Sequence, residues 1–118
     1  MPMTFSKKPD QRDLFRGALE MMVLRSVLRE PTDGYALVQH IKLRSNDLLQ
    51  VEVGSLYPAL QRPLKESLLK ADWEISASNR RVRTYRITPS GKRHLEREIF
   101  SFERMLDGIT LVLSPTEF

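Results

Sequence analysis

Residues 54–66 read GSLYPALQRPLKE, the pattern of a short amphipathic helix. Ser55 is a residue type that caps helix N-termini, and Pro58 is tolerated in a first turn because the backbone N–H there has no intrahelical partner. Apolar residues then recur at helical spacing, at Leu56, Ala59, Leu60, Pro63 and Leu64. We therefore expect a helix that is capped by Ser55, begins at Leu56 and buries one face.

The opposite face of this helix is polar and has no carboxylate before Glu66. It offers hydroxyl, amide, guanidinium and ammonium groups, at Ser55, Tyr57, Gln61, Arg62 and Lys65. Groups of these kinds hydrogen bond to phosphates and to base edges in the major groove of DNA. The sequence therefore predicts a recognition helix.

The composition limits the other functions open to the chain. Its 118 residues suffice for one domain with one core, and its net charge of +4 suits a polyanionic partner without identifying one. The absence of cysteine excludes disulfides, thiolate metal sites and thiol catalysis. Two distant histidines and five isolated glycines form no acid–base pair or phosphate loop, so we expect no enzyme, cofactor or metal site.

The chain has no sign of a membrane or secretory segment. No apolar run approaches the ~20 residues that span a bilayer, and the start, MPMTFSKKPD, lacks the apolar region of a signal peptide. We expect a cytoplasmic protein, with residues 1–9 as a mobile arm.

A long helix is predicted from Asp10, a capping residue, to the stop at Pro31. Apolar residues cover two of its sides, one with Phe15, Ala18, Leu19, Met22 and Val27, the other with Leu14, Met21, Leu24 and Leu28. A small protein has one core for such a helix to face, so we expect a second subunit to cover the second stripe.

Turn residues at 31–34 separate this helix from a second one, Tyr35–Leu43, which Thr32 or Asp33 can cap. The segment Leu48–Val53 is short and rich in branched residues, so we expect a strand-like connection there. The order of helix, turn, helix, link and helix is that of a helix-turn-helix unit.

A basic hairpin follows. Leu69, Ala71, Trp73 and Ile75 alternate with polar residues, residues 76–79 supply a turn, and Val82–Ile87 can return as the partner strand. Trp73 is expected to fasten the hairpin to the helices, with stacking on a base as the alternative. Six Lys or Arg residues and no acid lie between Glu74 and Glu96, so the hairpin cannot neutralise its own charge and is predicted to be a wing that contacts the DNA backbone.

The last predicted helix starts with a Thr88 cap and Pro89 at its first position, and the pattern ends at Pro115. Its apolar residues step alternately by four and three, at Leu95, Ile99, Phe102, Leu106, Ile109 and Leu113. This heptad spacing favours contact between subunits, the alternative being a helix folded back on its own core. The predicted dimer interface adds Phe15, Leu19 and Met22 to these six residues.

Four phrases, LFRGALEMMVLRSVL, DGYALVQHI, VEVGSLYPALQR and NRRVRTYRITPSGKRHL, together resemble the PadR family of bacterial transcriptional regulators, in its short form with a single C-terminal helix. The resemblance implies a homodimer, usually a repressor, that leaves a pseudo-palindromic operator in double-stranded DNA on meeting a small molecule or another signal. The chain departs from the family pattern at Pro63, where a kink or an end of the helix near Arg62 is expected, and at Ser67, which occupies a glycine site.

The predicted fold is mainly α with a small β-hairpin: a winged helix-turn-helix domain over 10–87 and a C-terminal dimerisation helix and tail over 88–118. DNA contacts are predicted at Tyr35, Ser55, Tyr57, Pro58, Gln61, Arg62, Lys65, Asn79, Arg80, Arg81 and Arg83. The alternative function is a winged-helix module that binds another protein and has no DNA target.

Overall fold

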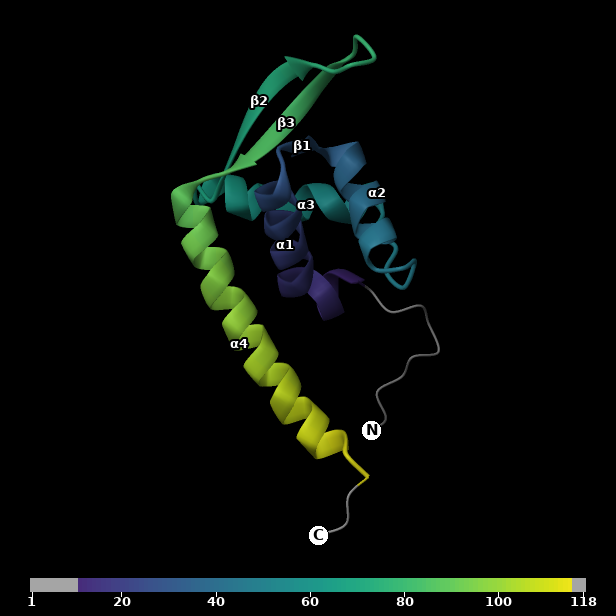
Figure 1. The fold of residues 1–118 in the computed structure, drawn as a ribbon, viewed down its shortest axis with the longest axis vertical. Coiled ribbons are helices and arrows are strands. Elements are labelled where there is room, and N and C mark those ends of the chain that lie inside the picture. Colours follow the sequence, from purple (N-terminus) through teal and green to yellow (C-terminus); the bar gives the residue numbers. More distant parts are fainter. Residues whose placement is uncertain (1–10, 116–118) are drawn as a thin grey trace.

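The computed structural model describes residues 11–115, and the side chains of residues 17–115. The predicted arm, the Asp10 cap and the side chain of Phe15 lie outside this part of the chain. The helices are α1 (Gln11–Arg29), α2 (Gly34–Arg44), α3 (Val53–Lys65) and α4 (Pro89–Leu113), and the strands are β1 (Thr32–Asp33), β2 (Leu69–Ile75) and β3 (Arg81–Ile87). Figure 1 shows α1, α2 and α3 packed as a body, the β2–β3 hairpin projecting from it, and α4 running away from it. The predicted winged-helix class is confirmed.

The core lies where the three body helices meet the root of the sheet and the start of α4. Its members are Leu19, Val23, Leu24, Val27, Leu37, Ile41, Val51, Leu56, Ala59, Leu60, Leu68, Leu69, Tyr85 and Leu95. Leu24, from the second stripe of α1, is 1% exposed, and Met21 and Leu28 pack partly against the same core. For these three residues the core of the same chain provides burial, complete for Leu24 and partial for Met21 and Leu28, so Leu24 does not need the second subunit expected to cover this stripe. The side chain of Leu14 lies outside the described residues.

The turn before α2 does more than connect two helices. The Asp33 carboxylate accepts a hydrogen bond of 2.9 Å from the Ala36 N–H, which confirms it as the cap. Thr32 and Asp33 also pair with β3, giving the strand order β1-β3-β2. The strand expected at 48–53 does not form, since β1 occupies the free edge of β3 and Val51 is instead buried in the core.

The recognition helix begins earlier than predicted. Glu52 is its N-cap, and its carbonyl accepts from the N–H groups of Ser55 and Leu56, at 2.9 and 3.0 Å. Ser55 is therefore inside the helix and is not a cap. Pro58 consequently lies beyond the first turn and deprives the carbonyl of Gly54 of its intrahelical donor, a loss that solvent can offset because Gly54 is exposed.

Of the two expectations for Pro63, an end of the helix near Arg62 is wrong, because α3 continues through Pro63 to Lys65. An interior proline costs about 3 kcal/mol in lost hydrogen bonding and crowding, but the Pro63 ring is fully buried in the core, which offsets this cost. The N–H of Leu68 then donates to the carbonyl of Pro63 at 2.8 Å, and that of Ser67 to Leu64 at 3.2 Å. This is a Schellman ending, with Ser67 in the left-handed region at φ 60°.

The predicted start of α4 is confirmed. Thr88 is the N-cap and Pro89 is the first helical residue. The Oγ1 atom of Thr88 accepts a hydrogen bond from the Gly91 N–H at 2.9 Å and donates one to the Ser67 carbonyl at 2.8 Å. Gly91 lies so close to the chain before β2 that an added Cβ would be 2.2 Å from the Leu68 carbonyl oxygen. The start of α4 is thus fixed against the junction between α3 and the wing.

The left-handed backbone at Ser67 generates a stability prediction. Replacing Ser67 with glycine should raise the free energy of unfolding by about 0.5–1 kcal/mol, because glycine adopts φ 60° without a steric penalty. Chemical denaturation at one fixed protein concentration measures this. Ser101→Gly, at an exposed position inside α4, is the matched control and should lower stability, because glycine is a poor helix former. A destabilised Ser67→Gly protein would contradict the interpretation.

Candidate nucleic-acid interface

One row of side chains runs along the exposed side of α3. Tyr57, Gln61 and Lys65 are spaced by four residues, so they lie above one another on one face of the helix. Tyr57 is 50% exposed, and Gln61, Lys65 and the neighbouring Pro58 are also exposed. The row presents a phenol, an amide and an ammonium group to a partner, as predicted for a helix that enters a groove.

Arg62 lies apart from this row, about 100° further round the helix. Its Nε atom is 3.8 Å from a carboxylate oxygen of Glu20 on α1 and 3.5 Å from one of Glu66, the C-cap residue of α3. The guanidinium is therefore turned toward α1 and must exchange these ion pairs for a DNA contact. Ser55 is only partly exposed. The exposed face of α3 is therefore centred on the row of Tyr57, Gln61 and Lys65, and Ser55 and Arg62 lie at its margins.

The start of α2 connects α3 to the wing. Gly34 is buried beside Tyr57, where an added Cβ would lie 3.4 Å from the phenol oxygen. The next residue, Tyr35, is 72% exposed. It shares a hollow with residues of the hairpin, the full lining being Asp33, Tyr35, Ser76, Ser78, Arg80 and Val82. The structure therefore brings Tyr35 and Arg80, far apart in the sequence, to one surface.

The apolar side chains in the outer half of the hairpin are not buried in the core. Trp73 is 60% exposed and Ile75 is 66% exposed, although Leu69 on the same face is buried. The Trp73 ring instead lies under the guanidinium of Arg81, 4.6 Å from it, a cation–π contact. The prediction that Trp73 fastens the wing to the helices is wrong, because the hairpin extends past them (Figure 1).

The charge of the wing is concentrated near its tip. Asn79, Arg80, Arg81 and Arg83 are exposed, and no carboxylate of the described residues forms an ion pair with these three arginines. Arg86, nearer the root, pairs with Glu74 on β2, and its hydrogen bond lowers the pKa of the Glu74 carboxyl. The hairpin thus neutralises one of its arginines, contrary to expectation, and leaves the outer ones available.

The sequence did not reveal the Trp73–Arg81 contact or the Glu74–Arg86 pair. The strand register could have found the first of these, because it sets Trp73 opposite Arg83 and Ile75 opposite Arg81, which puts Arg81 diagonally opposite Trp73 on one face. Glu74 and Arg86 share the other face but are two residue pairs apart, so the register alone does not single them out. The observed pairing leaves five connecting residues, 76–80, between the strands. The four-residue turn expected at 76–79 would have set Ile75 opposite Arg80 and shifted every pair by one residue, so the sequence did not predict these neighbours.

Comparison with known proteins decides the family. The model for the family described as "Transcriptional regulator PadR-like family" matches residues 23–97. The chain belongs to this family. It is also similar, at 29% identity over 105 residues, to an uncharacterised protein of Lysinibacillus sphaericus, covering 89% of this chain and 96% of that one.

Solved structures agree with this PadR assignment. A PadR family transcriptional regulator from Eggerthella lenta is 32% identical, with a TM-score of 0.74 and 88% of each chain covered. A transcriptional regulator from Clostridium thermocellum is 22% identical and shares the fold with a TM-score of 0.79, over 86% of this chain and 99% of that one. Family membership makes the chain a DNA-binding transcriptional regulator and not an enzyme. No helix of the described residues is long and apolar enough to cross a membrane.

The exposed Trp73 generates the second prediction. Trp73→Ala should lower the free energy of unfolding by less than about 1 kcal/mol, because the ring contacts Arg81 and little of the core. Leu69→Ala, on the same face of the same strand but buried, is the comparison and should cost about 2–5 kcal/mol. Chemical denaturation of both proteins tests this, and equal losses would show that the wing packs on the helices after all.

Proposed function

We propose that this PadR-family protein is a homodimeric repressor that inserts α3 into the major groove of a pseudo-palindromic operator and lays its wing on the adjacent backbone. The observation that carries the proposal is the continuity of one carboxylate-poor surface from the Tyr57–Gln61–Lys65 row through Tyr35 to the outer wing arginines. Repression, and release by a small molecule or another signal, follow from the family resemblance.

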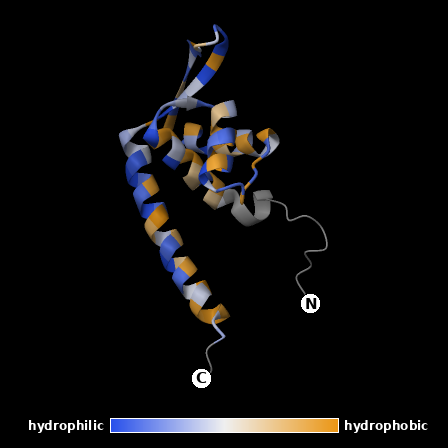
Figure 2. Ribbon diagram, turned by 45° about the vertical axis from the view of Figure 1, so that its right-hand side comes forward, coloured by the Kyte–Doolittle hydropathy of each residue, from blue (hydrophilic) through white to orange (hydrophobic). Residues whose placement is uncertain are grey.

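The long C-terminal helix supports the dimer. Past Phe102 the heptad series loses its contact with the body, and Leu106, Ile109 and Leu113 are 43%, 45% and 75% exposed. Figure 2 shows apolar segments continuing along α4 to its C-terminal end. An apolar seam of this length needs cover in water, and the same helix of a second copy supplies it by heptad packing.

The residues of the predicted dimer interface fall into two groups, those buried in their own chain and those still exposed. Leu19 and Leu95 are buried in the core of their own chain, so they position the helices and have little surface left for a partner. Ile99 and Phe102 are partly exposed, as is Met22 on α1. The contact between subunits is therefore expected to centre on the second half of α4.

The dimer prediction is tested with a charge in the exposed seam. Leu106→Glu should give a folded monomer, because burying a carboxylate between two apolar helices is unfavourable and the residue makes little contact within its own chain. Arg104→Glu, exposed and two residues away on the other side of α4, is the control and should keep the mass of the native protein. Sedimentation measures both, and a Leu106→Glu dimer of native affinity would refute the seam.

The wing prediction concerns salt dependence. Replacing Arg80 and Arg81 with alanine should weaken binding to operator and to scrambled duplex alike, since phosphate contacts carry no sequence information. The slope of log affinity against log salt should flatten by about 0.9 for each lost phosphate contact in each subunit. Arg104→Ala, which removes the same type of charge from α4, should leave the slope unchanged. An unchanged slope in the wing variant would remove these arginines from the DNA surface.

In the same assay, Gln61→Ala tests base recognition separately from phosphate binding. Loss of the Gln61 amide should reduce discrimination between operator and scrambled duplex by about 1–3 kcal/mol. It should leave the slope of log affinity against log salt unchanged. The operator for these measurements comes from electrophoretic selection of bound fragments out of random duplex. If no fragment is enriched by the native protein, the DNA proposal fails and the alternative, a module that binds another protein through its wing, takes its place.

A further inference from the structure

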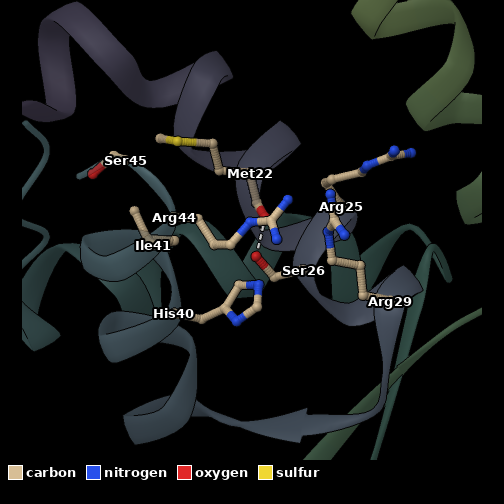
Figure 3. Close-up of a pocket in the computed structure, with 8 residues that line it drawn as sticks. All are labelled: Met22, Arg25, Ser26, Arg29, His40, Ile41, Arg44 and Ser45. Carbon is tan, nitrogen blue, oxygen red and sulfur yellow. Dashed lines mark hydrogen bonds between the residues drawn. The ribbon is translucent and has the colours of Figure 1, made fainter. Parts of the chain in front are cut away.

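A basic pocket of about 270 Å³ lies between α1 and α2, outside the surface assigned to DNA. Figure 3 shows its lining, which consists of Met22, Arg25, Ser26, Arg29, His40, Ile41, Arg44 and Ser45. Three of these eight residues are arginines, and none is acidic. The volume is just below the range of about 300–1,000 Å³ in which larger ligands bind, so the pocket suits a small molecule.

The arginines of the pocket are not neutralised by the carboxylates of the described residues. Among the described residues, no carboxylate forms an ion pair with Arg25, Arg29 or Arg44. In Figure 3 the guanidinium groups of Arg29 and Arg44 turn toward the centre of the lining, beside Ser26, whereas that of Arg25 turns away. Two guanidinium groups in one concave site attract an anion, and their planar donors match the oxygens of carboxylate or phosphate.

The floor of the pocket adds a buried group that lacks a partner. The Nε2 atom of His40 is buried and makes no hydrogen bond within the described residues. The nearby Ser26 hydroxyl already donates to the Met22 carbonyl at 2.7 Å, so it can only accept further bonds. Buried polar atoms are normally satisfied, and an orphaned one in a concave site is a sign of a ligand group. Met22 and Ile41 supply an apolar wall for the carbon part of such a ligand.

The position of the pocket argues against a DNA contact. Glu20 and Met22 are two residues apart on α1, about 200° round the helix, so they face opposite ways. Glu20 meets Arg62 of α3, which places Met22 and the pocket on the flank of α1 that is turned away from the recognition helix. The pocket instead adjoins the C-terminal half of α2, whose first turn carries Tyr35 at the wing.

We propose that this pocket is a binding site for a small organic or inorganic anion, held by Arg29 and Arg44, with His40 Nε2 bonding to the same group or its neighbour. Carboxylate and phosphate groups both offer negatively charged oxygens that accept hydrogen bonds from these donors. The site is independent of the proposed repressor function, since anion binding is measured without DNA.

The full-length protein is titrated calorimetrically with inorganic phosphate and, separately, with succinate, both at an ionic strength held constant with sodium chloride. The native protein should show saturable binding of one anion per chain. Arg44→Ala and the double variant Arg29→Ala/Arg44→Ala should weaken it at least about tenfold, because each removes a charged donor. His40→Phe, which keeps a ring of similar size but no donor or acceptor, should weaken it less. Arg97→Ala, an exposed arginine on α4, is the matched control and should bind normally.

The two titrations separate the sources of the anion, since tighter binding of phosphate indicates a phosphorylated ligand and tighter binding of succinate a carboxylic acid. Circular dichroism confirms that each variant is folded, and the single variants keep the test valid if the double variant is not. No saturable binding by the native protein would overturn the proposal. So would native-like binding by the folded arginine variants. If the native protein binds no anion and these variants lose DNA affinity with a flatter salt slope, the arginines contact the DNA backbone instead.

Discussion

The arrangement of the whole protein depends on one carbonyl group, that of Leu68. It accepts hydrogen bonds from the Thr88 N–H at 3.0 Å and from the Thr88 hydroxyl at 3.2 Å, and Gly91 approaches it too closely for any side chain. These contacts join the end of α3, the root of the wing and the first turn of α4 at one point. The junction thus fixes where the wing and α4 leave α3, and the packing of α1 on both β3 and α4 adds to this arrangement.

The distribution of carboxylates determines which cations are free to meet DNA. Arg62 pairs with Glu20 and Glu66, and Arg86 pairs with Glu74 near the root of the wing. Among the described residues, no carboxylate forms an ion pair with Arg80, Arg81 or Arg83. Exposed ion pairs are worth only about 0–1 kcal/mol, so Arg62 can exchange its partners at little cost when a phosphate is near. Carboxylates thus pair with Arg62 on α3 and with Arg86 in the inner half of the wing, and the arginines of the outer wing stay available.

α2 has a different kind of importance, since its two ends adjoin two candidate sites. Its first turn brings Tyr35 to the hollow beside the wing, and its last turns carry His40 and Arg44 into the basic pocket. Asp33 holds the first turn by capping it and by pairing with β3. A ligand that displaced the last turns would therefore act on the same helix that carries Tyr35, a residue proposed to contact DNA.

Local chemistry was enough to predict the elements. The Thr88–Pro89 start, the Asp33 cap and the alternation from Leu69 to Ile75 depend on neighbours a few residues away, and all three are confirmed. The tertiary structure decided what depends on distant contacts. Pro63 stays helical because the core covers its ring, and Trp73 is exposed because the hairpin extends past the helices. The third strand of the sheet is β1, at Thr32–Asp33, and not a strand at Leu48–Val53. Burial and strand pairing are properties of the assembled chain, and a residue's own sequence neighbourhood does not contain them.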